Sequence, residues 1–92
     1  MNMDVYWDPA KAEANHRKHG VRFPDAELVL YDPMALTMED PYAEDENRFV
    51  SLGWDATGRV TVVVYTYRDN HIRLISARRA TRQEQRVYEK GI

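Results

Sequence analysis

Three segments in the second half of the chain alternate between polar and apolar residues with a period of two. They run over residues 48–54, 59–67 and 71–78, and the stretches between them, DATG and RDN, have the composition of tight turns. Strands joined by such short connections pair antiparallel with their neighbours in sequence, so the pattern predicts a three-stranded meander. The middle segment, RVTVVVYTY, is apolar on both faces and is therefore expected to be a central strand.

The last of these strands carries arginine at its end. Alternation places Ile72 and Leu74 on the face expected to be buried, and it places Arg78 on that same face. A guanidinium group at the end of a buried face needs an anionic partner. That partner could be internal, such as Glu84 in the following helix, or external, such as a phosphate.

A helix is predicted over residues 9–19, before the strands. Asp8 supplies an N-cap carboxylate ahead of a proline at the first helical position, and Gly20 suits the C-cap. The small side chains of Ala10 and Ala14 are expected to pack against the sheet.

A second helix is predicted in VRFPDAELVLYDP, where Pro24 stands in the first turn and Pro33 ends the run. Ala26, Val29 and Leu30 recur at helical spacing and are expected to face the core. We expect both helices to pack on one face of the sheet.

The remaining segments complete an α+β architecture. Thr81 and Glu84 form a capping box that starts a short C-terminal helix. Residues 4–7 have the composition of an edge strand, and EDPYAEDE, residues 39–46, is expected to be a solvated loop. We therefore expect residues 1–92 to form one domain, with two N-terminal helices on an antiparallel sheet and a C-terminal helix at one end.

The charge of the chain is divided unevenly. Its 92 residues have a net charge of −2, but residues 1–46 carry four basic and eleven acidic side chains, a net of −7. Residues 47–92 carry nine basic and four acidic side chains, a net of +5. The second half can therefore present a cationic face, which is typical of proteins that bind phosphate-bearing partners.

Several classes of site are excluded or unsupported. The chain has no cysteine, which excludes disulfides and thiolate zinc sites. His16 and His19 are one turn apart but have no third ligand at a recognisable spacing, so neither a metal nor a cofactor is expected. The N-terminus lacks the pattern of a signal peptide and no stretch is long enough to span a bilayer, so we expect a cytoplasmic protein without a membrane partner.

If the phosphate-bearing partner is RNA, the chain has residue types suited to cleaving it. Cleavage of RNA without a metal needs a base, cations that stabilise the phosphorane, and an acid for the leaving oxygen. Histidine is suited to proton exchange near neutral pH and arginine to holding phosphate oxygens. The competing interpretation is structural, with Arg78 paired to Glu84 and the other arginines solvated.

The four segments WDPAKAEANHRKHGVRF, EDENRFVSLG, VVVYTYR and IRLISARRATRQEQRVYE together resemble the BrnT family of type II toxins. The resemblance covers nearly the whole chain. It implies a RelE-like fold, a ribonuclease activity that arrests translation, and neutralisation by a BrnA-like antitoxin. Such antitoxins resemble ribbon-helix-helix proteins, so the implied assembly contains two copies of each chain and contacts DNA only through the antitoxin.

The resemblance also suggests the site residues. The family blocks fall on Trp7, Asp8, Lys11, Asn15, Lys18, His19, Gly20, Arg48, Gly53, Arg73, Ser76, Ala77, Arg78, Ala80, Glu84 and Tyr88. We expect the catalytic residues among His19, Lys18, Arg78, Glu84 and Tyr88, and RNA phosphate binding by Lys11, Arg73, Arg79 and Arg82. His19 and Tyr88 are the expected proton-transfer pair, and Glu84 either orients Arg78 or acts as base. The alternative is a non-catalytic binding module, or a toxin that acts on a protein target.

Overall fold

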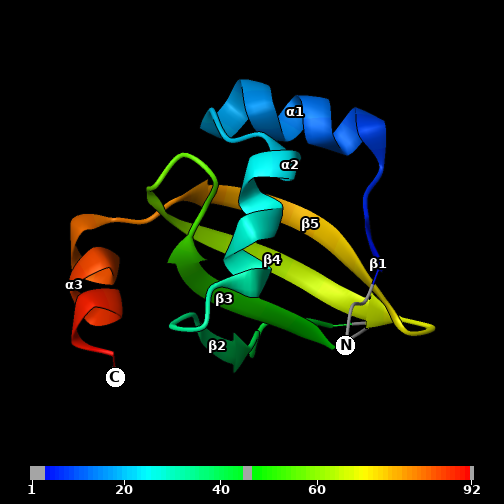
Figure 1. Cartoon of the computed structure of the whole chain (residues 1–92). Helices are drawn as coiled ribbons and strands as arrows, with labels where there is room; N and C mark the ends of the chain where they lie inside the picture. Colours follow the sequence, from blue (N-terminus) through cyan, green and yellow to red (C-terminus); the bar gives the residue numbers. More distant parts are fainter. Residues whose placement is uncertain (1–3, 45–46, 92) are drawn as a thin grey trace.

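The computed structural model describes residues 4–44 and 47–91. In this part of the chain, five strands form one sheet in the order β1-β5-β4-β3-β2 (Figure 1). The strands are β1 (Asp4–Tyr6), β2 (Leu36–Glu39), β3 (Arg48–Trp54), β4 (Val60–Arg68) and β5 (His71–Arg79). The helices are α1 (Pro9–His19), α2 (Phe23–Ala26), the 3₁₀ helix η1 (Glu27–Tyr31) and α3 (Arg82–Lys90). The architecture is therefore α+β.

The predicted meander is confirmed, because β3, β4 and β5 pair antiparallel in sequence order with β4 at the centre of the sheet. The sheet as a whole is mixed and not antiparallel throughout, since β1 runs parallel to β5. That pairing joins distant parts of the chain, and no local spacing predicts it. Strand β2 was also not predicted; it has four residues, most of them exposed.

The predicted helix ends are confirmed by their capping contacts. The Asp8 carboxylate accepts a hydrogen bond of 2.9 Å from the Ala10 N–H, and Gly20 ends α1 at φ 72°. That positive φ is costly for any residue with a Cβ, so glycine suits it. At α3, the side chains of Thr81 and Glu84 each bond the other's backbone N–H. These are short-range signals, which explains why sequence alone locates them.

The buried side of α1 differs from the prediction. Ala10 and Ala14 are exposed, whereas Ala12 packs against the core and Asn15 is buried. The Asn15 side chain occupies the position beside β5 because its amide bonds the backbone there, as described below. A polar residue thus fixes the helix where an alanine face was expected.

A bulge in β5 changes the face on which its last residues lie. Leu74 and Ser76 pair with consecutive residues of β4, which leaves Ile75 without a partner. Beyond this bulge Ala77 is buried in the same core as Leu74, and Arg78 points to the other side of the sheet. The prediction that Arg78 shares a face with Leu74 is therefore wrong, because one inserted residue reverses the alternation.

The two faces of the sheet differ in cover. Helices α2 and η1 lie over one, here called the core face, while α1 lies beside β5 at the edge of the sheet and α3 lies at one end of it (Figure 1). The core face buries Val63, Leu74 and Ala77 against Phe23 and Val29. The opposite face, here called the open face, carries the alternate residues of the strands: Leu36, Met38, Arg48, Val50, Leu52, Val62, Val64, Thr66, Arg73, Ser76 and Arg78.

Candidate functional site

Arg78 and Glu84 form a bidentate ion pair where β5 passes into α3. The guanidinium donates from Nη1 to Oε1 at 2.8 Å and from Nη2 to Oε2 at 2.9 Å. Both side chains remain partly exposed, at 44% for Arg78 and 33% for Glu84. The internal partner considered for Arg78 is thus present, yet the pair is open to solvent and to any anion that approaches.

Glu84 is held ionised by this arrangement. Its hydrogen bonds with Arg78 are the largest influence; burial opposes them, and the Thr81 N–H adds to them, so the pKa of Glu84 falls to about 2. The same pair raises the pKa of Arg78. A carboxylate with so low a pKa rarely takes up a proton near neutral pH, which suits a group that orients Arg78 better than a general base.

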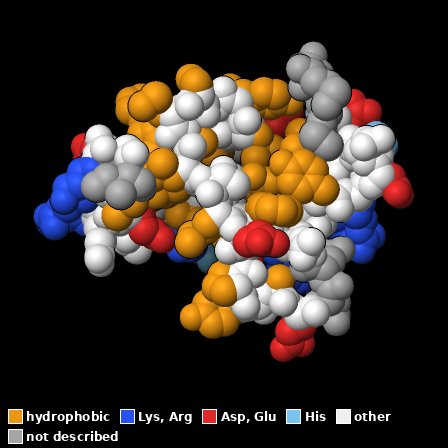
Figure 2. Space-filling model, turned by 90° about the horizontal axis from the view of Figure 1, so that it is seen from below, with side chains coloured by type: hydrophobic (Ala, Val, Ile, Leu, Met, Phe, Trp, Pro, Cys, Tyr) orange, Lys and Arg blue, Asp and Glu red, His pale blue; other side chains and the backbone are white. Residues whose placement is uncertain are grey.

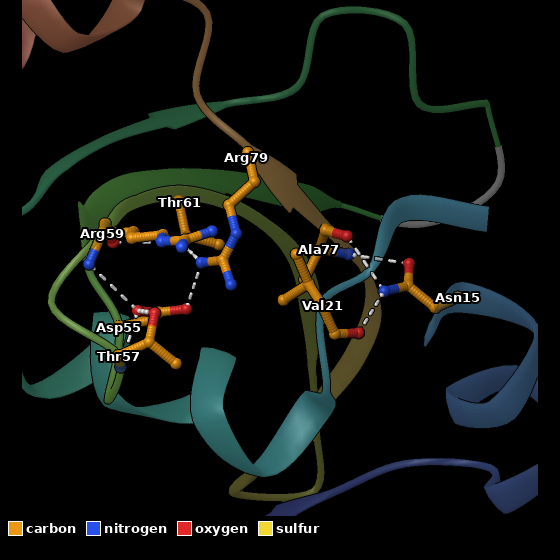
Figure 3. A network of polar contacts seen from close by, with 8 residues as sticks. All are labelled: Asn15, Val21, Asp55, Thr57, Arg59, Thr61, Ala77 and Arg79. Carbon is orange, nitrogen blue, oxygen red and sulfur yellow. Dashed lines mark hydrogen bonds and ion pairs between the residues drawn. The ribbon is translucent and has the colours of Figure 1, made fainter. Parts of the chain in front are cut away.

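The next residue, Arg79, points to the core face and is committed to a different carboxylate. Its Nη1 lies 2.5 Å from an Asp55 oxygen and donates to the Thr61 hydroxyl at 3.1 Å (Figure 3). The Asp55 side chain is completely buried. Burial acts to raise the pKa of Asp55, but hydrogen bonds from Thr57, Arg79 and Arg59 outweigh it and lower that pKa. Arg79 therefore ties the end of β5 to the β3–β4 turn.

Tyr88, also on α3, is hydrogen-bonded to Asp32. Its hydroxyl donates to Asp32 at 2.6 Å, and Asp32 also accepts the backbone N–H groups of Trp54 and Met34. Burial and the Asp32 carboxylate together raise the pKa of Tyr88 to about 12. Burial acts to raise the pKa of Asp32, but the three hydrogen bonds lower it overall. The contact anchors α3 to the segment that follows η1.

Helix α1 is fixed by Asn15 rather than by charged residues. Its amide donates to the carbonyls of Val21 at 3.1 Å and Ala77 at 2.9 Å, and its oxygen accepts the Ala77 N–H at 3.0 Å (Figure 3). Lys11 and Lys18 are exposed, and within residues 4–44 and 47–91 neither forms a hydrogen bond or an ion pair.

The structure does not bring all the predicted site residues together. Lys18 and His19 belong to α1, which packs beside β5 at the edge of the sheet, whereas Arg73 and Arg78 lie on the open face. Within residues 4–44 and 47–91 no hydrogen bond or ion pair joins the two sets. Arg78 and Glu84 are in direct contact, and Arg82 lies close to them as the first residue of α3.

The open face brings the predicted phosphate-binding residue Arg73 together with Arg48 and with His71, a residue that the sequence did not single out. Arg48 and Arg73 pair with the same residue of β4, Thr66, so the three stand in one row across the sheet. His71 lies two residues before Arg73 on the same face, with its Nδ1 3.6 Å from an Asp4 oxygen and its ring edge-on to Tyr6. An exposed histidine thus shares this face with two arginines. The alternation of β5 was the signal that could have identified His71.

Between this row and α3 the open face is apolar. A groove of about 440 Å³ is lined by Leu36, Met38, Leu52, Val62 and Val87, with Glu84 at its edge. Seen from below, the molecule shows hydrophobic side chains across the middle of its surface and Lys and Arg side chains at the left, where α3 lies, and at the right (Figure 2). RNA bases and phosphates could both find suitable contacts on such a face.

The described residues contain no group of three or more His, Asp or Glu side chains placed to hold a metal ion. None of their helices is long and apolar enough to cross a membrane.

Comparison with known proteins identifies the family. The model of the BrnT ribonuclease toxin of type II toxin-antitoxin systems matches residues 7–84. The crystal structure of the Brucella abortus ribonuclease toxin BrnT is similar, with a TM-score of 0.65 and 25% sequence identity over 88% of this chain and 100% of that one. No curated protein matches the sequence. Because the family match spans most of the chain, this protein belongs to the BrnT family of ribonuclease toxins of type II toxin-antitoxin systems.

Proposed function

We propose that the chain is an endoribonuclease that needs no metal ion, and that RNA binds across the open face of the sheet. The observation that carries this proposal is the position of Arg48, Arg73 and Arg78 on that one face. Arg73 and Arg78 pair with Thr66 and Val62, which are four residues apart on β4, roughly 13 Å at about 3.3 Å per residue. That span exceeds the spacing of neighbouring phosphates in a strand, so the face can hold more than one nucleotide.

The arginines take the electrostatic role in this proposal. Arg78 and Arg73 bind phosphate oxygens and stabilise the charge that develops in the transition state. Glu84 fixes the Arg78 guanidinium by two hydrogen bonds and stays ionised. Lys11, Lys18 and Arg82 contact RNA further from the cleaved bond, and Arg79 acts through Asp55 by supporting the strand end.

Histidine takes the proton-transfer role. His71 lies on the same face as Arg73, which favours it as the group that exchanges a proton with the 2′-hydroxyl or the leaving oxygen. His19, on α1, is the alternative. Tyr88 was considered as its partner, but a phenol with a pKa of about 12 that donates to Asp32 is better suited to holding α3 in place.

The biological setting of the proposal follows the family. RNA cleavage in the cytoplasm arrests translation, and an antitoxin similar to BrnA neutralises the chain. The antitoxin has a ribbon-helix-helix domain, and the complex contains two copies of each protein and contacts DNA only through the antitoxin. The RelE-like description of the fold is part of this proposal.

Two observations favour a second candidate function. Arg78 already has a carboxylate partner, and the chain has a net charge of −2, which weakens general attraction to RNA. Under this alternative the chain binds a partner without catalysis, or acts on a protein target, and the arginines serve that interface or the fold.

Expression of the chain in a bacterial host distinguishes the two candidate functions. Amino-acid incorporation is measured after induction of the wild type, Arg78→Ala, and Arg22→Ala as a matched exposed arginine before α2. We expect rapid arrest of translation with the wild type and Arg22→Ala, and relief by Arg78→Ala at an equal soluble level and by the co-expressed neighbouring gene. Normal incorporation with soluble wild-type protein would contradict the ribonuclease proposal.

A further inference from the structure

A second cavity lies on the other side of α3 from the open-face groove. It has a volume of about 440 Å³, and its lining includes Trp54, Gly58, Arg59, Arg79, Gln85 and Glu89. Its size falls in the range of small-ligand sites. Helix α3 separates the two hollows, because Glu84 and Val87 line the groove whereas Gln85 and Glu89 line this cavity.

Trp54 gives the cavity an aromatic wall. The residue is 52% exposed, which is high for so large an apolar side chain in this small domain. Its backbone is fixed, since its N–H donates to Asp32 at 2.9 Å. Gly58 lies beside the ring in the turn, at φ 77°, and a Cβ there would lie 4.0 Å from the indole. The indole is thus held in place with one part of its surface open.

The charges of the cavity suit a base better than a phosphate. Arg59 and Arg79 line the cavity, but the Arg79 guanidinium is already neutralised by Asp55 and Glu89 adds a carboxylate. A carboxylate in the wall repels a phosphate. A nucleobase is uncharged, stacks on indole, and carries donors and acceptors on its edge.

From this arrangement we infer that the cavity beside Trp54 binds one base of single-stranded RNA and prefers guanine. The base stacks on Trp54, and its neighbouring phosphate contacts Arg59, which is exposed. Guanine presents two adjacent donors, N1–H and the N2 amino group, and a carboxylate such as Glu89 accepts both. Adenine and uracil lack that pair of donors. The inference rests on the proposed function, because it gives the ribonuclease a base-reading subsite across α3 from the open-face groove.

The affinity of uncleavable RNA tests the inference. Labelled hexamers with 2′-O-methyl groups throughout carry one guanine, or inosine or adenine in its place, and their dissociation constants are measured by fluorescence anisotropy. We expect Trp54→Ala to weaken binding about five- to hundred-fold, the effect of losing one stacked base. Trp54→Phe should restore part of it, and Tyr42→Ala, at an exposed aromatic in the loop between β2 and β3, should have no effect.

Glu89→Gln tests the guanine preference while leaving Trp54, the stacking residue, unchanged. It should abolish the preference for guanine over inosine and leave the affinity for the inosine hexamer close to that of the wild type. Since Glu89 is exposed, this variant should remain folded even if Trp54→Ala does not. Equal binding of the three hexamers by the wild type, or an unchanged preference in Glu89→Gln, would overturn the inference.

The outcomes also separate this inference from the proposed function. If the wild type cleaves unmodified RNA but Trp54→Ala binds hexamers as the wild type does, the subsite is refuted and the ribonuclease stands. If Trp54→Ala weakens only the binding of the antitoxin, the cavity belongs to that protein interface and the subsite is again refuted. If the wild type neither binds nor cleaves RNA, both proposals fail.

Discussion

Arg78 and Arg79 are adjacent in sequence, but their surroundings have little in common. Arg79 turns to the core face and meets Asp55, whose side chain is 0% exposed, whereas Arg78 turns to the open face and meets Glu84, which is 33% exposed. Because the Asp55 carboxylate is buried, water cannot replace Arg79 as its partner. The exposed pair can exchange its contacts with solvent or a ligand. A run of arginines in the sequence therefore divides into one residue that maintains the fold and one available for function.

The largest expected effect is on stability at the buried pair. Arg79→Ala leaves the Asp55 carboxylate buried without its cation, which should lower the free energy of unfolding by about 3 kcal/mol. Arg78→Ala removes a solvent-exposed pair and should cost about 1 kcal/mol. Urea unfolding of both variants gives the two values. Equal losses would show that the two arginines do not differ in the way the structure indicates.

Tyr88→Phe tests the anchor of the helix that carries Glu84. It removes a hydrogen bond to the Asp32 carboxylate and should lower the free energy of unfolding by about 2 kcal/mol at neutral pH. The pKa of Tyr88 is raised to about 12, so its contribution is complete below the usual tyrosine pKa and is lost as the pH rises toward 12.

The difference in free energy of unfolding between the wild type and Tyr88→Phe should therefore shrink as the pH rises toward 12. Tyr42→Phe, at a tyrosine that is 87% exposed, is the matched control and should equal the wild type. An advantage over Tyr88→Phe that grows with pH would contradict the assigned hydrogen bond.

The smallest stability effect is expected at Glu84, and its pH dependence has the opposite sign. Glu84→Gln should cost about 1 kcal/mol at pH 7, because solvent screening reduces the full value of the pKa shift. The pKa falls from 4.5 to about 2, so the contribution is complete above 4.5 and is lost as the pH falls toward 2. Urea titrations from pH 7 to about pH 3 should show the two proteins converging. A difference that does not change with pH would argue against an ionised pair.

Local signals in the sequence predicted the parts of the fold that are formed by neighbouring residues. The caps at Asp8, Gly20 and Thr81 depend on contacts within a few residues, and the meander depends on alternation and short turns. The same signals could not reveal the parallel pairing of β1 with β5, which joins the two ends of the chain. They also gave no sign of the bulge at Ile75, which changes the face of Arg78.

The candidate site was predictable only in part for the same reason. The pairing of Arg78 with Glu84 spans six residues and could be considered from the sequence. The partners of Arg79 and Tyr88, Asp55 and Asp32, lie 24 and 56 residues away, so only the folded sheet brings them together.

Cleavage of single-stranded RNA by the purified chain in excess EDTA tests the central proposal most directly. The wild type and Arg22→Ala should cleave, while folded Arg78→Ala and Arg73→Ala should lose about 100-fold in rate, the effect of removing one group that stabilises transition-state charge. The single variants His71→Gln and His19→Gln are assayed in parallel, and the one that loses cleavage identifies the proton-transfer residue. Cleavage by Arg78→Ala and Arg73→Ala at the wild-type rate would contradict the assignment of the reaction to the open face, and loss of all cleavage in EDTA would contradict its independence of metal.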